Sequence, residues 1–140
     1  MCAILPLVKK TEPRIPVSPM ILVVDDDRLT RWSLSRILKR EGYRLDEAAS
    51  IAESLTAIDR RRPDLILLDV RLPDGDGFAL LKTIRGSHPG LPVVMMTAHA
   101  NRGTAETALA LGACAHLGKP CDPAELLSTV DRALSRNPPA

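Results

Sequence analysis

The sequence predicts one α/β domain in which a five-stranded parallel sheet carries helices on both faces. From about residue 19, short apolar runs alternate five times with segments of helical period. The apolar runs are nearly continuous, as in strands that are buried on both faces. A length of 140 residues, 45% of them hydrophobic, supplies the core of one such domain but hardly of two.

The first strand is predicted at 20–24, with the sequence MILVV. A helix follows and ends before Gly42, because glycine readily adopts the left-handed conformation that terminates helices. We expect Trp32 in this helix to pack in the core. The residues that recur at helical spacing are Leu29, Trp32, Ser33, Arg36, Ile37 and Arg40.

The second strand is predicted at 43–49, where polar and apolar residues alternate as in an edge strand. Ser50 and Glu53 then form the capping-box pattern at the start of a helix at 51–61. Pro63 ends this unit, since proline lacks the N–H that a helix needs.

Three further strand–helix units complete the alternation. In the last helix Asp122 is a suitable N-cap, and Pro123 occupies the first helical position, where proline is tolerated. The strands are predicted at 64–68, 91–96 and 113–117, and the helices at 77–87, around 103–112 and at 122–136.

Composition limits the classes of function. The net charge of +2 is spread along the chain without a basic block, and only Trp32, Tyr43 and Phe78 are aromatic, so direct nucleic-acid binding is not expected. No stretch approaches the roughly 20 apolar residues of a membrane span, so no membrane contact is expected. The cysteines Cys2, Cys114 and Cys121 are odd in number and lack paired metal-ligand spacing, which indicates reduced thiols in a cytoplasmic protein.

The N-terminal residues differ from the rest. Residues 1–18 contain three prolines and no sustained period, and we expect a flexible extension there. The domain is then expected at 19–137, with a tail at 138–140.

Polar side chains follow four of the predicted strands. Asp25 and Asp26 follow the first strand, Asp69 the third, Thr97 the fourth and Lys119 the fifth. In open parallel sheets ligands bind beyond the carboxyl ends of the strands, so these side chains are expected at one edge. Three carboxylates there are unfavourable without a cation, and their oxygens suit Mg²⁺. With a lysine and a hydroxyl beside them, the chemistry indicated is phosphorylation of an aspartate.

Four motifs make a resemblance specific. The segments LVVDDD, DLILLDVRLPDGDG, VVMMTAH and GKP have the order and spacing of a response-regulator receiver domain, the phospho-acceptor part of bacterial two-component systems. The resemblance covers about 19–136. It implies a flavodoxin-like (βα)5 fold with strand order 2-1-3-4-5, and a signalling switch that takes part in its own phosphoryl transfer and autodephosphorylation rather than a metabolic enzyme.

Carried over by position, the resemblance makes Asp69 the phosphorylated residue. Asp26, Asp69 and the backbone carbonyl of Arg71 would bind Mg²⁺, with Asp25 completing the acidic pocket. Thr97 and Lys119 would bind the phosphoryl oxygens.

The same resemblance implies further structural and functional features. A cis peptide bond would precede Pro120, and Pro73 and Gly77 match the turn after the acceptor strand. The donor would be a sensor histidine kinase or a histidine phosphotransfer protein. Phosphorylation would switch the surface of the fourth helix, fifth strand and fifth helix, and so control an effector protein, a homodimer or transcription.

One position departs from the family pattern. Three residues before the lysine the family usually has Tyr or Phe, whereas this sequence has His116. Because imidazole is smaller and titrates between pH 5 and 8, we hypothesise that the switch is altered or pH-sensitive. An unchanged phosphorylation-linked response after His116→Tyr would contradict this hypothesis.

Other assignments remain open. A haloacid-dehalogenase-like phosphohydrolase also uses an aspartyl nucleophile and Mg²⁺, and Asp25 and Asp27 resemble its motif, although Leu29 replaces the expected Thr or Val. A non-phosphorylated scaffold on the receiver fold is a third class. Three further aspartates and two histidines are expected to be solvated loop residues that take no part in the site, namely Asp27, Asp74, Asp76, His88 and His99.

Two segments and the C-terminal residues bear on the output of the switch. The segments DDDRLTRW and MTAHANR resemble most the receivers of bacterial enhancer-binding activators. The chain ends in SRNPPA, which fits either a stand-alone receiver that binds another protein or the receiver part of a longer regulator with its own output domain.

Overall fold

The computed structural model describes residues 18–98 and 102–136 and shows the predicted parallel sheet, with strands in the order β2-β1-β3-β6-β7. Counted in chain order, this is the predicted order 2-1-3-4-5. The strands are β1 (Met20–Val24), β2 (Arg44–Ala48), β3 (Leu65–Asp69), β6 (Val93–Thr97) and β7 (Ala115–Gly118). The helices are α2 (Arg28–Arg40), α3 (Ile51–Arg60), α4 (Gly77–Ser87), α5 (Arg102–Ala110) and α6 (Pro123–Arg136).

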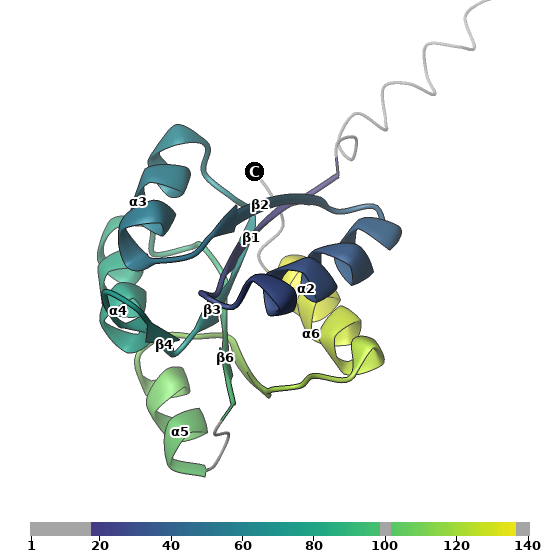
Figure 1. The fold of residues 1–140 in the computed structure, drawn as a ribbon. Coiled ribbons are helices and arrows are strands. Elements are labelled where there is room, and N and C mark those ends of the chain that lie inside the picture. Colours follow the sequence, from purple (N-terminus) through teal and green to yellow (C-terminus); the bar gives the residue numbers. More distant parts are fainter. Residues whose placement is uncertain (1–17, 99–101, 137–140) are drawn as a thin grey trace, which may run out of the picture.

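The helices form two layers around the sheet, with α2 and α6 on one face and α3, α4 and α5 on the other (Figure 1). Because neighbouring side chains of a strand point to opposite faces, Ile21 and Val23 pack toward α2 and α6, while Leu22 and Val24 pack toward the other layer. All five residues of β1 are buried, which explains why its sequence is continuously apolar.

The helix caps follow the sequence closely. The Ser50 side chain accepts a hydrogen bond from the Glu53 backbone N–H at 3.1 Å. The Glu53 carboxylate accepts one in return from the N–H of Ala49 at 2.8 Å, one residue earlier than in the usual capping box. Asp122 accepts from the N–H of Glu125, as expected for an N-cap.

A short hairpin between β3 and α4 was not predicted. It consists of β4 (Arg71–Leu72) and β5 (Gly75–Asp76), which pair antiparallel. Two residues per strand are too few to show a period in the sequence, so the sequence indicates only the turn itself.

The expected core face of α2 is wrong in part. The buried residues of this helix are Leu34, Ser35 and Leu38, whereas Leu29 is 66% and Trp32 55% exposed. Apolar residues lie on two sides of the first half of α2, and helical period alone does not decide which side meets the sheet. Arg36 instead lies over the ring of Trp32, 5.2 Å from its centroid.

Three aspartates assigned to solvated loops are exposed, as expected, but each also accepts a hydrogen bond beside the start of a helix, which was not expected. Asp74 accepts hydrogen bonds from the N–H groups of Ile51 and Ala52 at the start of α3, and these bonds lower its pKa. Asp76 caps α4 by accepting from the N–H of Phe78. Asp27 precedes α2 and accepts from the Thr30 hydroxyl, which lowers its pKa.

The remaining predictions concern cysteines, histidines and membrane spans. Within the described residues Cys114 and Cys121 form no disulfide bond, while Cys2 and His99 lie outside these residues. His88 ends α4 half-buried rather than on the open surface. Within 18–98 and 102–136, no helix has the length and apolar character that a bilayer crossing needs.

Candidate functional site

The carboxyl ends of the central strands meet at one edge of the sheet. β1 and β3 are parallel neighbours with Val24 opposite Leu68, so the residues that follow come together. β6 lies on the other side of β3, and its last residue, Thr97, is opposite Gly118 of β7. The topology therefore gathers all five predicted site residues, although the strands that carry them are far apart in sequence.

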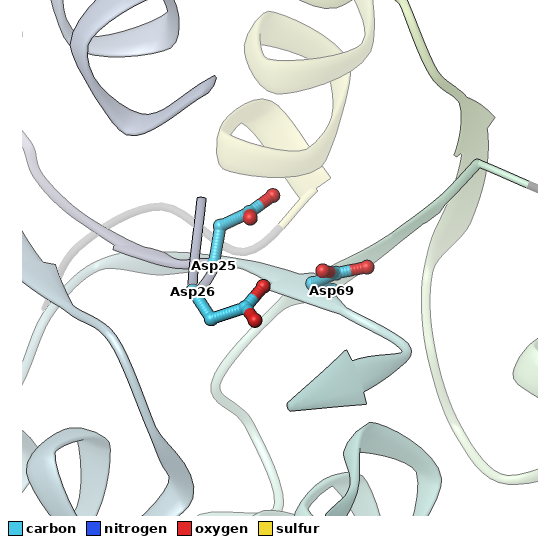
Figure 2. A group of neighbouring side chains, drawn as sticks. All are labelled: Asp25, Asp26 and Asp69. Atoms are coloured by element: carbon cyan, nitrogen blue, oxygen red, sulfur yellow. The ribbon is translucent and has the colours of Figure 1, made fainter. Parts of the chain in front are cut away.

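Three carboxyl groups lie side by side at this edge (Figure 2). One oxygen from each of Asp25, Asp26 and Asp69 lies within 4.8 Å of the others. Asp25 and Asp69 are buried, whereas Asp26 is exposed. The hydrogen bonds to Asp25 include one from the N–H of Asp27, at 2.9 Å.

Lys119 joins two of these carboxylates. Its Nζ lies 2.5 Å from Oδ2 of Asp25 and 3.2 Å from Oδ2 of Asp69. Its backbone N–H donates to the carbonyl of Thr97 at 2.8 Å, and the peptide bond from Lys119 to Pro120 is cis, as the resemblance implied. The ammonium group is thus directed into the acidic cluster from the end of β7.

The pKa values reflect crowding of like charges. Burial raises the pKa of Asp69, and the charge of Asp25 raises it further, against the opposing effect of Lys119. Burial acts to lower the pKa of Lys119, but its hydrogen bonds and charge interactions with Asp25 and Asp69 outweigh burial, so that pKa is raised. One ammonium group therefore compensates the cluster only in part.

An open depression of about 200 Å³ lies over this cluster. Asp26, Asp69, Thr97 and Lys119 line it together with Arg71, whereas Asp25 is not among its lining residues. The depression is therefore a pocket with carboxylates on one side and a hydroxyl and an ammonium group beside them. Leu72, Pro73 and Ala98 complete the lining.

The donor set fits a hard divalent cation. Carboxylate oxygens and backbone carbonyls are the ligands that Mg²⁺ prefers, and it commonly keeps several waters, for which the open pocket leaves room. Asp26 and Asp69 face this pocket, and Arg71 lines it. Among the residues that the structure describes, the cluster contains no cysteine or histidine, so the softer transition metals are less well matched.

The turn before α4 packs directly on the site. The Gly77 N–H donates to the carbonyl of Val70 at 2.6 Å. A Cβ atom at Gly77 would overlap the backbone carbonyl oxygen of Asp69 and lie 3.0 Å from the Cα of Val70. The glycine predicted in this turn is therefore required by the close approach of the two backbone segments.

His116 lies on β7, opposite Met95 of β6. It is half-buried, and among the described residues its Nε2 is buried without a hydrogen-bond partner. Burial lowers its pKa, so the neutral imidazole is favoured at neutral pH.

Sequence reasoning missed two residues beside the site, Arg31 and Glu47. Arg31 donates from Nη1 to the backbone carbonyl of Asp25 at 2.7 Å and from Nε to the Glu47 carboxylate at 3.1 Å. The one sequence signal for Arg31 is its place four residues after Asp27, in the first turn of the helix, which puts its side chain near the three aspartates.

Comparisons with known proteins agree on one family. A model of the response regulator receiver domain matches residues 21–131. The chain is 43% identical over 116 residues to the DNA-binding transcriptional regulator NtrC of Escherichia coli (strain K12), covering 83% of this chain and 25% of that protein. It is 34% identical to sporulation initiation phosphotransferase F of Bacillus subtilis (strain 168), covering 81% of this chain and 92% of that protein.

Solved structures give the same result. A CheY-like response regulator receiver domain protein from Methanospirillum hungatei JF-1 has a TM-score of 0.81 and 34% identity, covering 86% of this chain and 96% of that one. NtrX from Brucella abortus has a TM-score of 0.82 and 38% identity, covering 86% of this chain and 28% of that one. The chain thus spans about a quarter of the length of NtrC and NtrX.

Proposed function

Because the chain belongs to the family of response regulator receiver domains, we propose that it accepts a phosphoryl group on Asp69 within a two-component phosphorelay. The observation that carries the proposal is the meeting of Asp25, Asp26, Asp69 and Lys119 in and beneath one open pocket. Receiver domains are signalling switches, and the proposed location is the cytoplasm.

The proposed reaction uses groups that line the pocket. An oxygen of Asp69 attacks the phosphorus of a phosphohistidine in line, the bond from phosphorus to the donor nitrogen breaks, and the imidazole leaves with the electron pair. Lys119 and Thr97 bind the phosphoryl oxygens, and the product is a mixed anhydride. Mg²⁺, bound by Asp26, Asp69 and the Arg71 carbonyl with Asp25 nearby, would neutralise charge between the carboxylates and the phosphoryl group.

The test is incubation of the protein with acetyl phosphate, with intact mass as the readout. In the presence of Mg²⁺ we expect one phosphoryl group per chain, and in excess EDTA we expect none, because the carboxylates then repel the incoming anion. Equal labelling with and without Mg²⁺ would contradict the metal requirement, and no labelling in either condition would contradict phosphorylation.

The phosphoryl donor is proposed to be a histidine kinase or a histidine phosphotransfer protein. Support comes from Leu29 and Trp32, which we call the α2 patch. Both are large, exposed and apolar, and Leu29 lies in the first turn of α2, two residues after Asp27. Exposed apolar side chains beside a reactive pocket suit a protein that must bring a phosphohistidine to it.

Replacing Trp32 by Ala should slow phosphoryl transfer from the protein donor about tenfold, because aromatic residues supply much of the binding energy of interfaces. Labelling by acetyl phosphate should stay unchanged, since a small donor needs no docking surface. The matched control is Leu109→Ala, which removes a side chain of similar exposure (53%) from α5. Equal loss with both donors would show that Trp32 acts through the pocket rather than through docking.

His116 is proposed to alter the response of the surface formed by α5, β7 and α6. Because burial lowers the pKa of His116, its protonation should occur only on the acidic side of the ordinary histidine range. Any pH-dependent change in the switch should therefore appear there. A partner that recognises this surface would be an effector protein, a second copy of the chain or an output domain of the same regulator.

Two other functions were considered for this site, a haloacid-dehalogenase-like hydrolase and a scaffold that is not phosphorylated. The haloacid-dehalogenase alternative is wrong, because the receiver family matches residues 21–131. In the structure Asp27, the second aspartate of that motif, is bound to Thr30 and does not line the pocket. A receiver-fold scaffold that needs no phosphate remains a candidate, and its partner binding would survive Asp69→Asn. The similarity to NtrC supports a transcriptional output, which is a proposal because the match covers only 25% of NtrC.

A further inference from the structure

Asp26 differs from the other two aspartates of the cluster in how its side chain is held. Asp25 is buried and bonded to Lys119, and Asp69 is held by its place at the end of β3. Asp26 is exposed, and within the described parts of the chain no hydrogen bond or ion pair holds its carboxylate. Its position must therefore come from the backbone of residues 25 to 27.

Arg31 binds that backbone at both ends. Its side chain donates from Nη1 to the carbonyl oxygen of Asp25 at 2.7 Å, and its main-chain N–H donates to the carbonyl of Asp27 at 3.0 Å. The carbonyl of Asp25 belongs to the peptide plane that joins Asp25 to Asp26. A hydrogen bond to it restricts the rotation of this plane and hence the direction in which the Asp26 side chain leaves the chain.

Glu47 holds the guanidinium group in this orientation. The Glu47 carboxylate accepts from Nε of Arg31 at 3.1 Å, and it also accepts from the hydroxyl of Ser35, which is buried in α2, at 3.3 Å. Glu47 is opposite Val23 in the register of β1 and β2. The planar guanidinium thus binds two acceptors in different directions, the carboxylate on β2 and the carbonyl at the end of β1.

We propose that Arg31, oriented by Glu47, is a positioning residue for the cation site, and that it fixes the Asp25–Asp26 peptide so that Asp26 faces the pocket before a cation binds. The inference rests on the proposed function, because it concerns the site at which Mg²⁺ would bind. The inference goes beyond the proposed function because it assigns a role to Arg31 and Glu47, whose side chains do not line the pocket.

Because Arg31 is positively charged and lies beside a cation site, its charge and its positioning role have opposite effects on Mg²⁺ affinity. If Arg31 acted only through its charge, removing it would leave the carboxylates more negative, and Mg²⁺ would bind more tightly. If Arg31 positions Asp26, removing it lets the peptide plane rotate, and Mg²⁺ binds more weakly. The two roles therefore predict opposite changes in the dissociation constant.

The experiment is a calorimetric titration of Mg²⁺ into the wild type and the Arg31→Met variant, which keeps the apolar stem but removes the charge and the donors. We expect the dissociation constant to rise about tenfold, the lower end of the effect of residues that orient metal ligands. Arg31→Lys keeps the charge but not the two-directional donor geometry, and we expect it to restore only part of the affinity. At saturating Mg²⁺, the rate of labelling by acetyl phosphate should return to within about twofold of wild type.

The neighbouring pair Arg60 and Asp46 is a matched control. These residues form the same kind of ion pair, at 3.4 Å, between α3 and the residue of β2 next to Glu47, but neither bonds to residues 25 to 27. Arg60→Met removes an equal charge and should leave the dissociation constant unchanged. Thermal melting of each variant shows that it folds.

A second readout needs no metal. In Arg31→Met, the backbone amide resonances of Asp26 and Asp27 should shift and broaden in Mg²⁺-free buffer, and in Arg60→Met they should not. Unchanged or tighter Mg²⁺ binding by folded Arg31→Met would overturn the inference and leave the proposed function intact. Absence of Mg²⁺ binding in the wild type would instead overturn the cation requirement, and unaltered amide resonances in Arg31→Met would then overturn the positioning role as well.

Discussion

Asp69→Asn should accept no phosphoryl group from acetyl phosphate or from a phosphohistidine donor, while the domain stays folded. The amide has no anionic oxygen that can form the mixed anhydride, so the loss should be complete rather than partial. The substitution also removes one of three crowded carboxylates. Because burial and the charge of Asp25 already raise the pKa of Asp69, the neutral amide should stabilise the Mg²⁺-free protein or leave its stability unchanged.

Intact mass after incubation with donor and Mg²⁺ measures the first outcome, and thermal melting in EDTA measures the second. Asp59→Asn is the matched control, since Asp59 is an exposed residue of α3 and its replacement should leave labelling at the wild-type level. Labelling of Asp69→Asn at the wild-type rate would mean that another residue is the acceptor. Peptide mapping would then identify that residue.

Gly77→Ala should have the second large effect, on stability and on phosphorylation together. The added Cβ would overlap the carbonyl oxygen of Asp69, and its next neighbours, the Cα of Val70 at 3.0 Å and the carbonyl carbon of Asp69 at 3.1 Å, are also backbone atoms. Backbone cannot rotate away as a flexible side chain can. We expect the free energy of unfolding to fall by about 3 kcal/mol, the upper range for overpacking, and labelling to slow because the acceptor strand must shift.

Gly86→Ala is the control for this prediction. Gly86 lies in the same helix, α4, and a Cβ atom added there would meet nothing within 4 Å, so alanine should raise stability by up to about 1 kcal/mol through helix propensity. Chemical denaturation of both variants measures the difference. Equal stabilities of the two variants would contradict the argument from close backbone approach.

Much of the fold was predictable because the local signals agree with one another. The predicted helix at 77–87 has the observed bounds, and Ser50 and Asp122 cap the helices that they were expected to cap. The five site residues could be assembled in advance because parallel strands end at the same edge of a sheet. Motifs that resemble a known family supplied the proposed roles of these residues.

The features that the sequence did not predict have a common physical origin. The core position predicted for Trp32 is wrong, and the assignment of Asp74 to a solvated loop missed its hydrogen bonds to α3, because both used only each residue and its neighbours in sequence. In the folded chain α2 turns Leu34 and Leu38 to the sheet instead, and Asp74 reaches the N-terminus of α3, 22 and 23 residues earlier in the chain. Such contacts depend on how elements approach one another, which periodicity does not encode.

The sequence by itself determined the order of strands and helices, the five polar residues that follow four of the strands, and the place of the glycine in the turn before α4. These features depend on local conformational preference, on burial and on spacing along the chain. Only the tertiary structure decided which stripe of α2 faces the sheet, that Lys119 bonds both Asp25 and Asp69, and that Arg31 and Glu47 bind the backbone beside Asp26. Those contacts join residues from separate elements, and their energies depend on distances that exist only after the sheet has formed.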